Sequence, residues 1–154
     1  MFRKILVPLD GSVLSEQALP MAAEQARASG GELMLLHSMH LPEDLMWLPS
    51  LSEPLLSWKE SVRRSCEEYL ARVRERAGDV PVQVAIPEGE PARAILDAAE
   101  RHGSDLIAMV THGRTGPGRW LLGSVAARVM RHAPCPVLLV RARADSNRSF
   151  QGLS

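Results

Sequence analysis

Residues 105–125 read DLIAMVTHGRTGPGRWLLGSV, and the rest of the chain is organised around this stretch. It opens with an unbroken apolar run, Leu106 to Val110, which is typical of a strand covered on both faces in a parallel sheet. A loop rich in glycine and arginine follows, and Gly123-Ser124 then opens a segment with the pattern of a helix. The stretch therefore predicts a strand, a loop and a helix in direct succession.

The loop after this strand combines three ways to hold an anion. Its glycines let a ligand approach the backbone closely, and Arg114 and Arg119 offer guanidinium donors that suit phosphate. The first N–H groups of the following helix are unpaired, and Ser124 adds a hydroxyl beside them. Short glycine motifs also occur in ordinary surface loops. These residues alone leave open both a phosphate site and a basic surface loop.

The composition indicates one globular unit without a strong bias of charge. The chain has 154 residues, enough for one domain with a substantial core. Its 18 basic and 18 acidic residues argue against a general nucleic-acid or membrane-surface binder. No apolar run approaches the ~20 residues that span a bilayer, and the N-terminus does not read as a signal peptide. Cys66 and Cys135 lack metal-ligand spacing, so we expect reduced thiols in a cytoplasmic protein.

Apolar runs and helical patterns alternate along the chain. Pro20 inside the first helical segment predicts a kink or a broken first turn, and residues 40–57 contain too many prolines for one long helix. We expect residues 1–141 to form a single domain and the polar residues 142–154 to be disordered. The expected strands are 4–9, 33–38, 82–86, 106–110 and 137–140, and the expected helices are 13–29, 57–77, 92–102 and 125–132.

Such an alternating chain builds a parallel sheet with helices on both faces, because the crossovers are right-handed. We expect an α/β fold with a doubly wound, open, five-stranded sheet in the order 3-2-1-4-5. Ligands in such sheets bind outside the carboxyl ends of the strands where strand order reverses, here between the first and fourth strands. The turns at that point are residues 8–12, which include Asp10, and residues 110–113. The loop and Asp10 should therefore face one crevice, which favours a nucleotide site.

Six stretches carry short motifs in a fixed order. They are KILVPLDGS at 4–12, LLH at 35–37, GEP at 89–91, THGRTG at 111–116, LGSV at 122–125 and HAPCPVLLV at 132–140. Together they resemble the universal stress protein family over about residues 2–141. The resemblance implies a sheet of the order given above and a homodimer joined through the last strand, Val137 to Val140. It also implies membership of either an ATP-binding branch or a branch that does not bind ATP.

The ATP-binding branch of that family has a glycine, two residues, a second glycine, nine residues, and then Gly-Ser or Gly-Thr. Gly113 and Gly123-Ser124 match this motif, whereas Val110 stands where the first glycine is expected. Two outcomes are open: the branched side chain blocks the ligand, or the ligand shifts slightly and still uses the backbone N–H. The rest of the motif is intact, which favours binding of ATP, with or without Mg²⁺.

The same resemblance implies which residues contact the nucleotide. Ser38 stands where the family often has a small apolar residue, so the adenine wall is expected to be more polar here. A turn or capping role for Asp10, and a solvated role for Arg114, are equally open. The residues expected to border adenosine are Pro8, Asp10, Ser38 and Met109, and those expected around ribose and phosphates are Val110, Gly113, Arg114, Gly123, Ser124 and Val125.

The function favoured by these residues is an ATP-binding, homodimeric regulatory protein of the stress response, acting on an unidentified protein partner. Val110 and the apolar stretch 41–58 suggest the alternative of a dimeric interaction module that binds no nucleotide. In that stretch, Trp47 and Trp58 either form a flap or partner surface, or cover the edge of the second strand. A very slow ATPase is the third hypothesis, although the sequence shows neither a P-loop lysine nor a clear general base.

Overall fold

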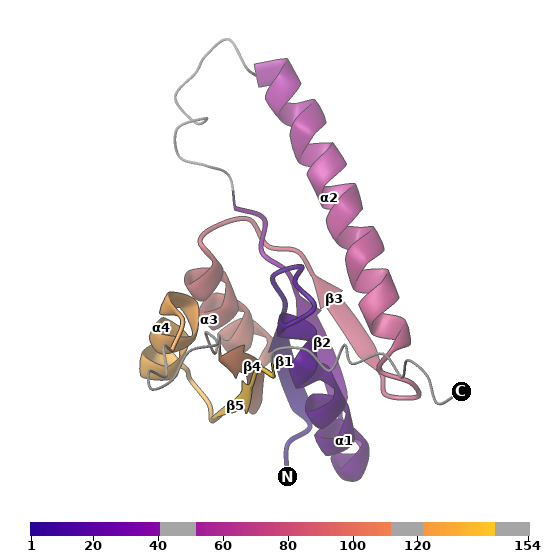
Figure 1. The fold of residues 1–154 in the computed structure, drawn as a ribbon, viewed down its shortest axis with the longest axis vertical. Coiled ribbons are helices and arrows are strands. Elements are labelled where there is room, and N and C mark those ends of the chain that lie inside the picture. Colours follow the sequence, from indigo (N-terminus) through magenta and orange to yellow (C-terminus); the bar gives the residue numbers. More distant parts are fainter. Residues whose placement is uncertain (41–51, 112–121, 144–154) are drawn as a thin grey trace, which may run out of the picture.

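The computed structural model describes residues 1–40, 52–111 and 122–143. Its centre is a five-stranded parallel sheet in the order β3-β2-β1-β4-β5 (Figure 1), which confirms the predicted strand order. The strands are β1 (Lys4–Pro8), β2 (Glu32–Leu36), β3 (Val82–Ala85), β4 (Leu106–Thr111) and β5 (Val137–Arg141).

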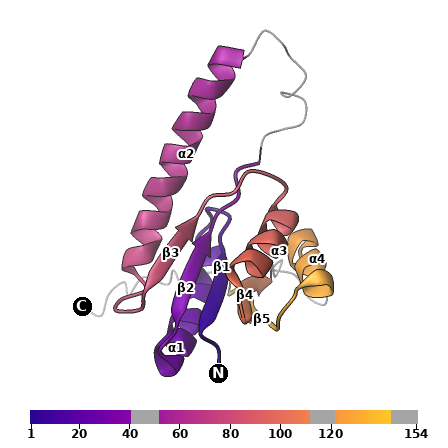
Figure 2. The same ribbon diagram turned by 180° about the vertical axis from the view of Figure 1, so that it is seen from behind.

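Helices cover both faces of this sheet, as Figures 1 and 2 show from opposite sides. One face buries residues of α1 and α2 against β1, β2 and β4, and the other buries residues of α3 and α4 against the same three strands. The fold is therefore doubly wound, as predicted. The helices are the short 3₁₀ helix η1 (Ser15–Ala18), α1 (Leu19–Ser29), α2 (Ser52–Glu75), α3 (Pro91–His102) and α4 (Ser124–His132).

Two helix boundaries differ from the sequence prediction for reasons that involve proline. The expected helix 13–29 is divided into η1 and α1, and Pro20 is the second residue of α1, where its missing N–H is not needed. The helix expected at 57–77 begins earlier than predicted, because α2 already starts at Ser52. Pro54 lies in the first turn of α2, the one part of a helix that tolerates proline. Residues 41–51, with Trp47, lie outside the described residues.

Backbone contacts at the amino ends of the strands fix the sheet register. The Asp105 carboxylate accepts hydrogen bonds from the N–H groups of Arg3 (2.8 Å) and Lys4 (3.0 Å), which ties β4 to β1. Glu32 donates its N–H to the carbonyl of Arg3 at 2.7 Å. A Cβ at Gly31 would lie 2.4 Å from that carbonyl oxygen, so only glycine allows the chain to enter β2 so close to β1.

Helix α2 is longer than the layer it covers. Its 24 residues rise about 36 Å at ~1.5 Å per residue, whereas a five-residue strand spans about 17 Å. The buried side chains of α2 lie in its second half, at Cys66, Leu70 and Val73. The first half extends past the carboxyl ends of the strands (Figure 1) and bears Leu56 and Trp58, which are 62% and 41% exposed.

At the end of β5, Arg143 is joined to η1 by two hydrogen bonds. Its N–H donates to Gln17 Oε1 (2.9 Å), and Gln17 Nε2 donates to the Arg143 carbonyl (3.0 Å). The predicted disorder of the tail concerns residues 144–154, which lie outside the described residues. Across the described ranges, no helix combines the length and the apolar character needed to cross a bilayer.

Candidate functional site

A cavity of about 410 Å³ lies at the carboxyl ends of β1, β2 and β4, where the strand order reverses. Eight of the ten predicted site residues line it, and the other two, Gly113 and Arg114, lie outside the described residues. The turn after β1, the end of β2, the end of β4 and the start of α4 are thus brought together as predicted. The eight are Pro8, Asp10, Ser38, Met109, Val110, Gly123, Ser124 and Val125.

Met109 and Val110 both border the cavity, but their side chains pack on opposite faces of the sheet. Met109 belongs to the core cluster on the α3 and α4 face, together with Ile95 and Ala126. Val110, only 8% exposed, belongs to the cluster on the α1 face with Val7 and Leu9. The side chain of Val110, which replaces the first glycine of the nucleotide motif, is therefore largely buried in the core beside α1.

The turn after β1 is held by hydrogen bonds that centre on Asp10. The Asp10 carboxylate accepts from the Ser12 N–H (2.8 Å) and from the Ser12 hydroxyl, and the Asp10 N–H donates to Ser15 Oγ (3.3 Å). Gly11 has a φ of +86°, a conformation that side chains rarely adopt. The turn role of Asp10, one of the two open alternatives, is thus present.

Helix α4 begins at the cavity without a side-chain cap. Gly123 is the N-cap residue, and its carbonyl accepts the first hydrogen bond of the helix, from the N–H of Ala127 at 2.9 Å. The N–H groups of Ser124, Val125 and Ala126 precede that bond and have no acceptor within the helix. All three residues line the cavity. Unpaired donors and the positive end of the helix dipole favour an anion at this point.

Helix α3 begins at the same cavity but is capped by its own chain. The Glu90 carboxylate accepts from the N–H groups of Ala92 and Arg93, both at 3.0 Å, and pairs with Arg128 at 3.1 Å. Burial raises the pKa of Glu90, but these hydrogen bonds and the positive charges of Arg128 and His40 outweigh it and hold the pKa below its usual value. A carboxylate thus already occupies the anion position of α3.

The cavity also includes residues that sequence reasoning did not assign to the site. His37 is packed: its Nδ1 is 2.8 Å from the carbonyl oxygen of Leu9, and its ring meets Tyr69 edge to face. The predicted strand order could have indicated these residues, because the positions just after β2 and at the start of α3 lie at the same carboxyl edge of the sheet as the predicted site. The unassigned lining residues are Leu9, Ser15, Leu36, His37, Pro91, Ile95 and Ala126.

The fold and the cavity define the class of protein: a doubly wound α/β protein with a ligand-sized crevice at the point of strand reversal. Residues 1–141 match the sequence model of the universal stress protein family, and the chain belongs to this family.

The chain is similar to members of this family from several organisms. It is 36% identical over 141 residues to a universal stress protein of Thermus aquaticus, with 92% of this chain and all of that protein covered. The solved structure of the universal stress protein UspA from Lactobacillus plantarum matches with a TM-score of 0.76 at 25% identity, covering 91% and 98% of the two chains. A universal stress protein solved in complex with cAMP matches with a TM-score of 0.63 at 25% identity, covering 92% and 98%.

Proposed function

We propose that this universal stress protein is an adenine-nucleotide-binding regulatory protein with ATP as its ligand. The observation that carries the proposal is the cavity at the strand reversal, where eight residues expected to contact nucleotide surround the uncapped start of α4. Its volume of about 410 Å³ is in the range of small-molecule sites. The related protein solved with cAMP supports an adenine nucleotide as the ligand class.

In the proposed complex, the nucleotide follows the cavity from β2 to α4. Pro8, Asp10, Ser38 and Met109 border adenosine, and the phosphates meet the N–H groups at the start of α4 together with the Ser124 hydroxyl. Gly113 and Arg114, which lie outside the described residues, are proposed to contact the phosphates. The burial of Val110 beside α1 supports the proposal, because it leaves most of the added side chain outside the ligand's space.

Mg²⁺ would arrive with the phosphates. Proteins commonly hold this ion through one or two carboxylates, water and the phosphate oxygens of a bound nucleotide; Asp10 lines the cavity but is expected at its adenosine end. Within the described residues, no group of three or more histidine, cysteine or acidic side chains is placed to hold a metal ion by itself.

We further propose a cytoplasmic homodimer of single-domain subunits, each comprising residues 1–141, that acts on a protein partner. Strand β5 supports this assembly, because it lies at the edge of the sheet and its residues 137–140 are only half-buried. In the described part of the chain, β5 pairs with β4 alone. An edge strand of this kind is a template for pairing with a second copy.

Native mass spectrometry of freshly purified protein, followed by calorimetric titration with Mg-ATP and with AMP, tests the proposal. We expect a dimer that binds about one adenine nucleotide per subunit. The variant Gly123→Asp should lower ATP affinity at least about tenfold, because it places a carboxylate where the phosphates bind. The backbone tolerates this change, since Gly123 has a φ of −58° and aspartate is a favourable N-cap residue.

Met130→Asp is the matched control, because it adds the same charge to an exposed position of α4 outside the cavity. It should bind ATP like the wild type. A dimer that ignores both nucleotides would refute the proposal and identify the chain as an interaction module without nucleotide. Phosphate release that is faster in the wild type than in Gly123→Asp would instead favour a slow ATPase.

A further inference from the structure

The cavity at the strand reversal offers hydrogen-bond donors but little positive charge for a chain of phosphates. Among the described residues, neither an arginine nor a lysine lines it. The first N–H groups of α4 suit one phosphate group, whereas ATP carries two more phosphates than AMP. Arg114, which is proposed to contact the phosphates, lies outside the described residues. A cation close to the start of α4 would therefore influence which nucleotides bind.

Arg128 of α4 brings a guanidinium to this place. It follows Ser124 by four residues, so the two side chains lie on the same face of the helix. Side chains on a helix lean toward its N-terminus, and Arg128 reaches far enough to bond with Glu90, the N-cap residue of α3. The guanidinium therefore lies at the gap between the starts of α3 and α4, and both starts line the cavity, through Pro91 and Ser124.

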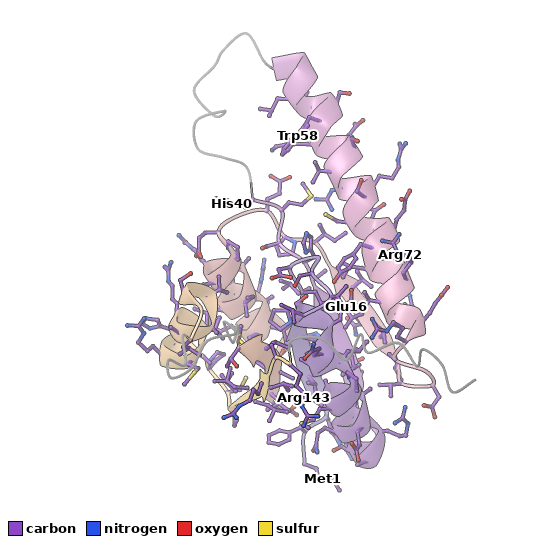
Figure 3. The ribbon with its side chains drawn as sticks, in the orientation of Figure 1. Met1, Glu16, His40, Trp58, Arg72 and Arg143 are labelled. Atoms are coloured by element: carbon purple, nitrogen blue, oxygen red, sulfur yellow. The ribbon has the colours of Figure 1, made fainter. Side chains whose placement is uncertain are left out.

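The Glu90 carboxylate fixes the position of this guanidinium. Its Oε2 atom accepts from Arg128 Nη1 at 3.1 Å and from the N–H of Arg93 at 3.0 Å, and its Oε1 atom accepts from the N–H of Ala92 at 3.0 Å. His40, which is labelled in Figure 3, contributes further positive charge at Glu90. The carboxylate is thus surrounded by donors, so it holds Arg128 in place without presenting its full charge to a ligand.

Glu90 uses only part of the hydrogen-bonding capacity of Arg128. A guanidinium has five N–H donors in one plane, and Glu90 accepts from a single nitrogen atom of Arg128. The Arg128 side chain is 53% exposed, so a ligand at the rim of the cavity can reach the other nitrogen atoms. The planar fork of a guanidinium fits the oxygen atoms of a phosphate. Arg128 can therefore hold Glu90 and a phosphate at the same time.

We propose that Arg128 binds the terminal phosphates of the nucleotide and makes the site select ATP over AMP. This inference rests on the proposed nucleotide site. The phosphate nearest the ribose meets the start of α4 in both nucleotides, so it contributes equally to both affinities. The further phosphates of ATP extend to the gap between α3 and α4, where the Arg128 guanidinium lies. They gain a charge-assisted hydrogen bond that AMP lacks.

Calorimetric titration of the full-length protein with Mg-ATP and with AMP tests this role, and the ratio of the two affinities is the quantity to compare. Arg128→Gln should lower the preference for ATP over AMP at least about fivefold, because ATP alone loses a hydrogen bond to a charged group. The affinity for AMP should stay within about twofold of wild type, because charges beyond direct contact are largely screened by salt. Arg128→Lys, which keeps the charge without the planar fork, should have an intermediate preference.

Arg131→Gln serves as the control, because it removes the same charge from an exposed position nearly one turn further along α4. The Nε of Arg131 donates to a carbonyl of its own helix, that of Ala127, at 3.2 Å. This variant should bind both nucleotides like the wild type. A wild-type ratio of affinities in Arg128→Gln, or an equal fall of the ratio in Arg131→Gln, would overturn the proposal.

Two outcomes for the wild type separate this inference from the nucleotide proposal. A wild type that binds ATP and AMP with equal affinity would refute the role of Arg128 alone. A wild type that binds neither nucleotide would refute the proposed nucleotide site, and the role of Arg128 with it. Urea denaturation of Arg128→Gln excludes a folding defect, because the loss of an exposed ion pair should leave its unfolding close to that of the wild type.

Discussion

Helices α3 and α4 lie side by side on one face of the sheet (Figure 1) and start at the same cavity, but their first turns are completed differently. Glu90 precedes α3 and binds two of its first N–H groups. Gly123 precedes α4 and offers no side chain. Both helices present the positive end of a dipole to the cavity, yet only α4 leaves that end available to a ligand.

The residue before each helix therefore decides whether its first N–H groups can bind a ligand. At α3 these groups are bonded to the Glu90 carboxylate, so the helix only lines the cavity. At α4 the N-cap residue has no side chain, so an anionic ligand can bind there. Arg128 strengthens this division, because it reaches from α4 to Glu90 and helps to hold the internal carboxylate on α3. Variants at the first turns of α3 and α4 should change this difference in a measurable way.

The largest effect is expected from Ile95→Ala, which loosens α3 from the sheet. Ile95 is 3% exposed, packs in the core below α3 and lines the cavity. Its truncation should lower the free energy of unfolding by about 2–5 kcal/mol, as measured by urea denaturation. Leu96→Ala, at the half-buried neighbouring position, should cost less. Equal losses for the two variants would show that the cavity wall is not part of the tight core.

Removal of the Glu90 carboxylate should leave the first N–H groups of α3 without a charged cap, so that α3 resembles α4. Glu90→Gln should cost about 1 kcal/mol of stability at neutral pH through the lost cap. Because the native pKa of Glu90 lies below its ordinary value of 4.5, the carboxylate stabilises the fold above that pH. Its contribution disappears as the pH falls through the native pKa.

Urea denaturation from pH 7 to pH 3 measures this effect. The difference between wild type and Glu90→Gln should shrink below pH 4.5. Glu88→Gln, which removes only the exposed ion pair with Lys59, should differ from wild type by less at every pH. A difference that stays constant down to pH 3 would contradict the capping role.

The Ser124 hydroxyl at the start of α4 should contribute more to ATP affinity than to the stability of the fold. Ser124→Ala should weaken Mg-ATP by roughly fivefold to tenfold, the worth of about one hydrogen bond. The unfolding free energy without ligand should stay within about 0.5 kcal/mol of wild type, since Ser124 is exposed. Calorimetry and urea denaturation give the two values. Ser29→Ala, at the end of α1, is the control and should change neither by more than its error.

The smallest effect is expected when α4 is given a cap like that of α3. Gly123→Ser places a hydroxyl beside the first N–H groups and should stabilise the ligand-free protein by a few tenths of a kcal/mol. The same hydroxyl competes with the phosphates, so ATP should bind less tightly. Thermal unfolding with and without Mg-ATP would show both changes. A variant that is less stable but binds ATP more tightly would mean that glycine is required for the shape of the turn.

The sequence was sufficient to predict the strand order and the meeting of Asp10 with Gly123. Unbroken apolar runs marked the inner strands, the right-handed crossovers favoured a parallel sheet, and the family resemblance implied the order that places the turns after β1 and β4 together. The loop glycines and Arg114 lie outside the described residues, so their share of the site stays a prediction.

Other features depended on packing that a linear pattern does not contain. The start of α2 at Ser52 was missed because Pro54 was taken as a breaker, although a first turn tolerates it. The capping role of Glu90 was not predicted, because glutamate is not among the usual N-cap residues. The side of the sheet on which Val110 packs follows from alternation in β4, but only once Met109 is known to face α3 and α4.

The uneven burial of α2 has a consequence for the lifetimes of its hydrogen bonds. Its second half is anchored through Leu70 and Val73, so its amide protons should exchange with solvent only when much of the protein opens. Between residues 55 and 65 no side chain is buried, and the amides of that half should exchange through local fraying at a far lower cost in free energy.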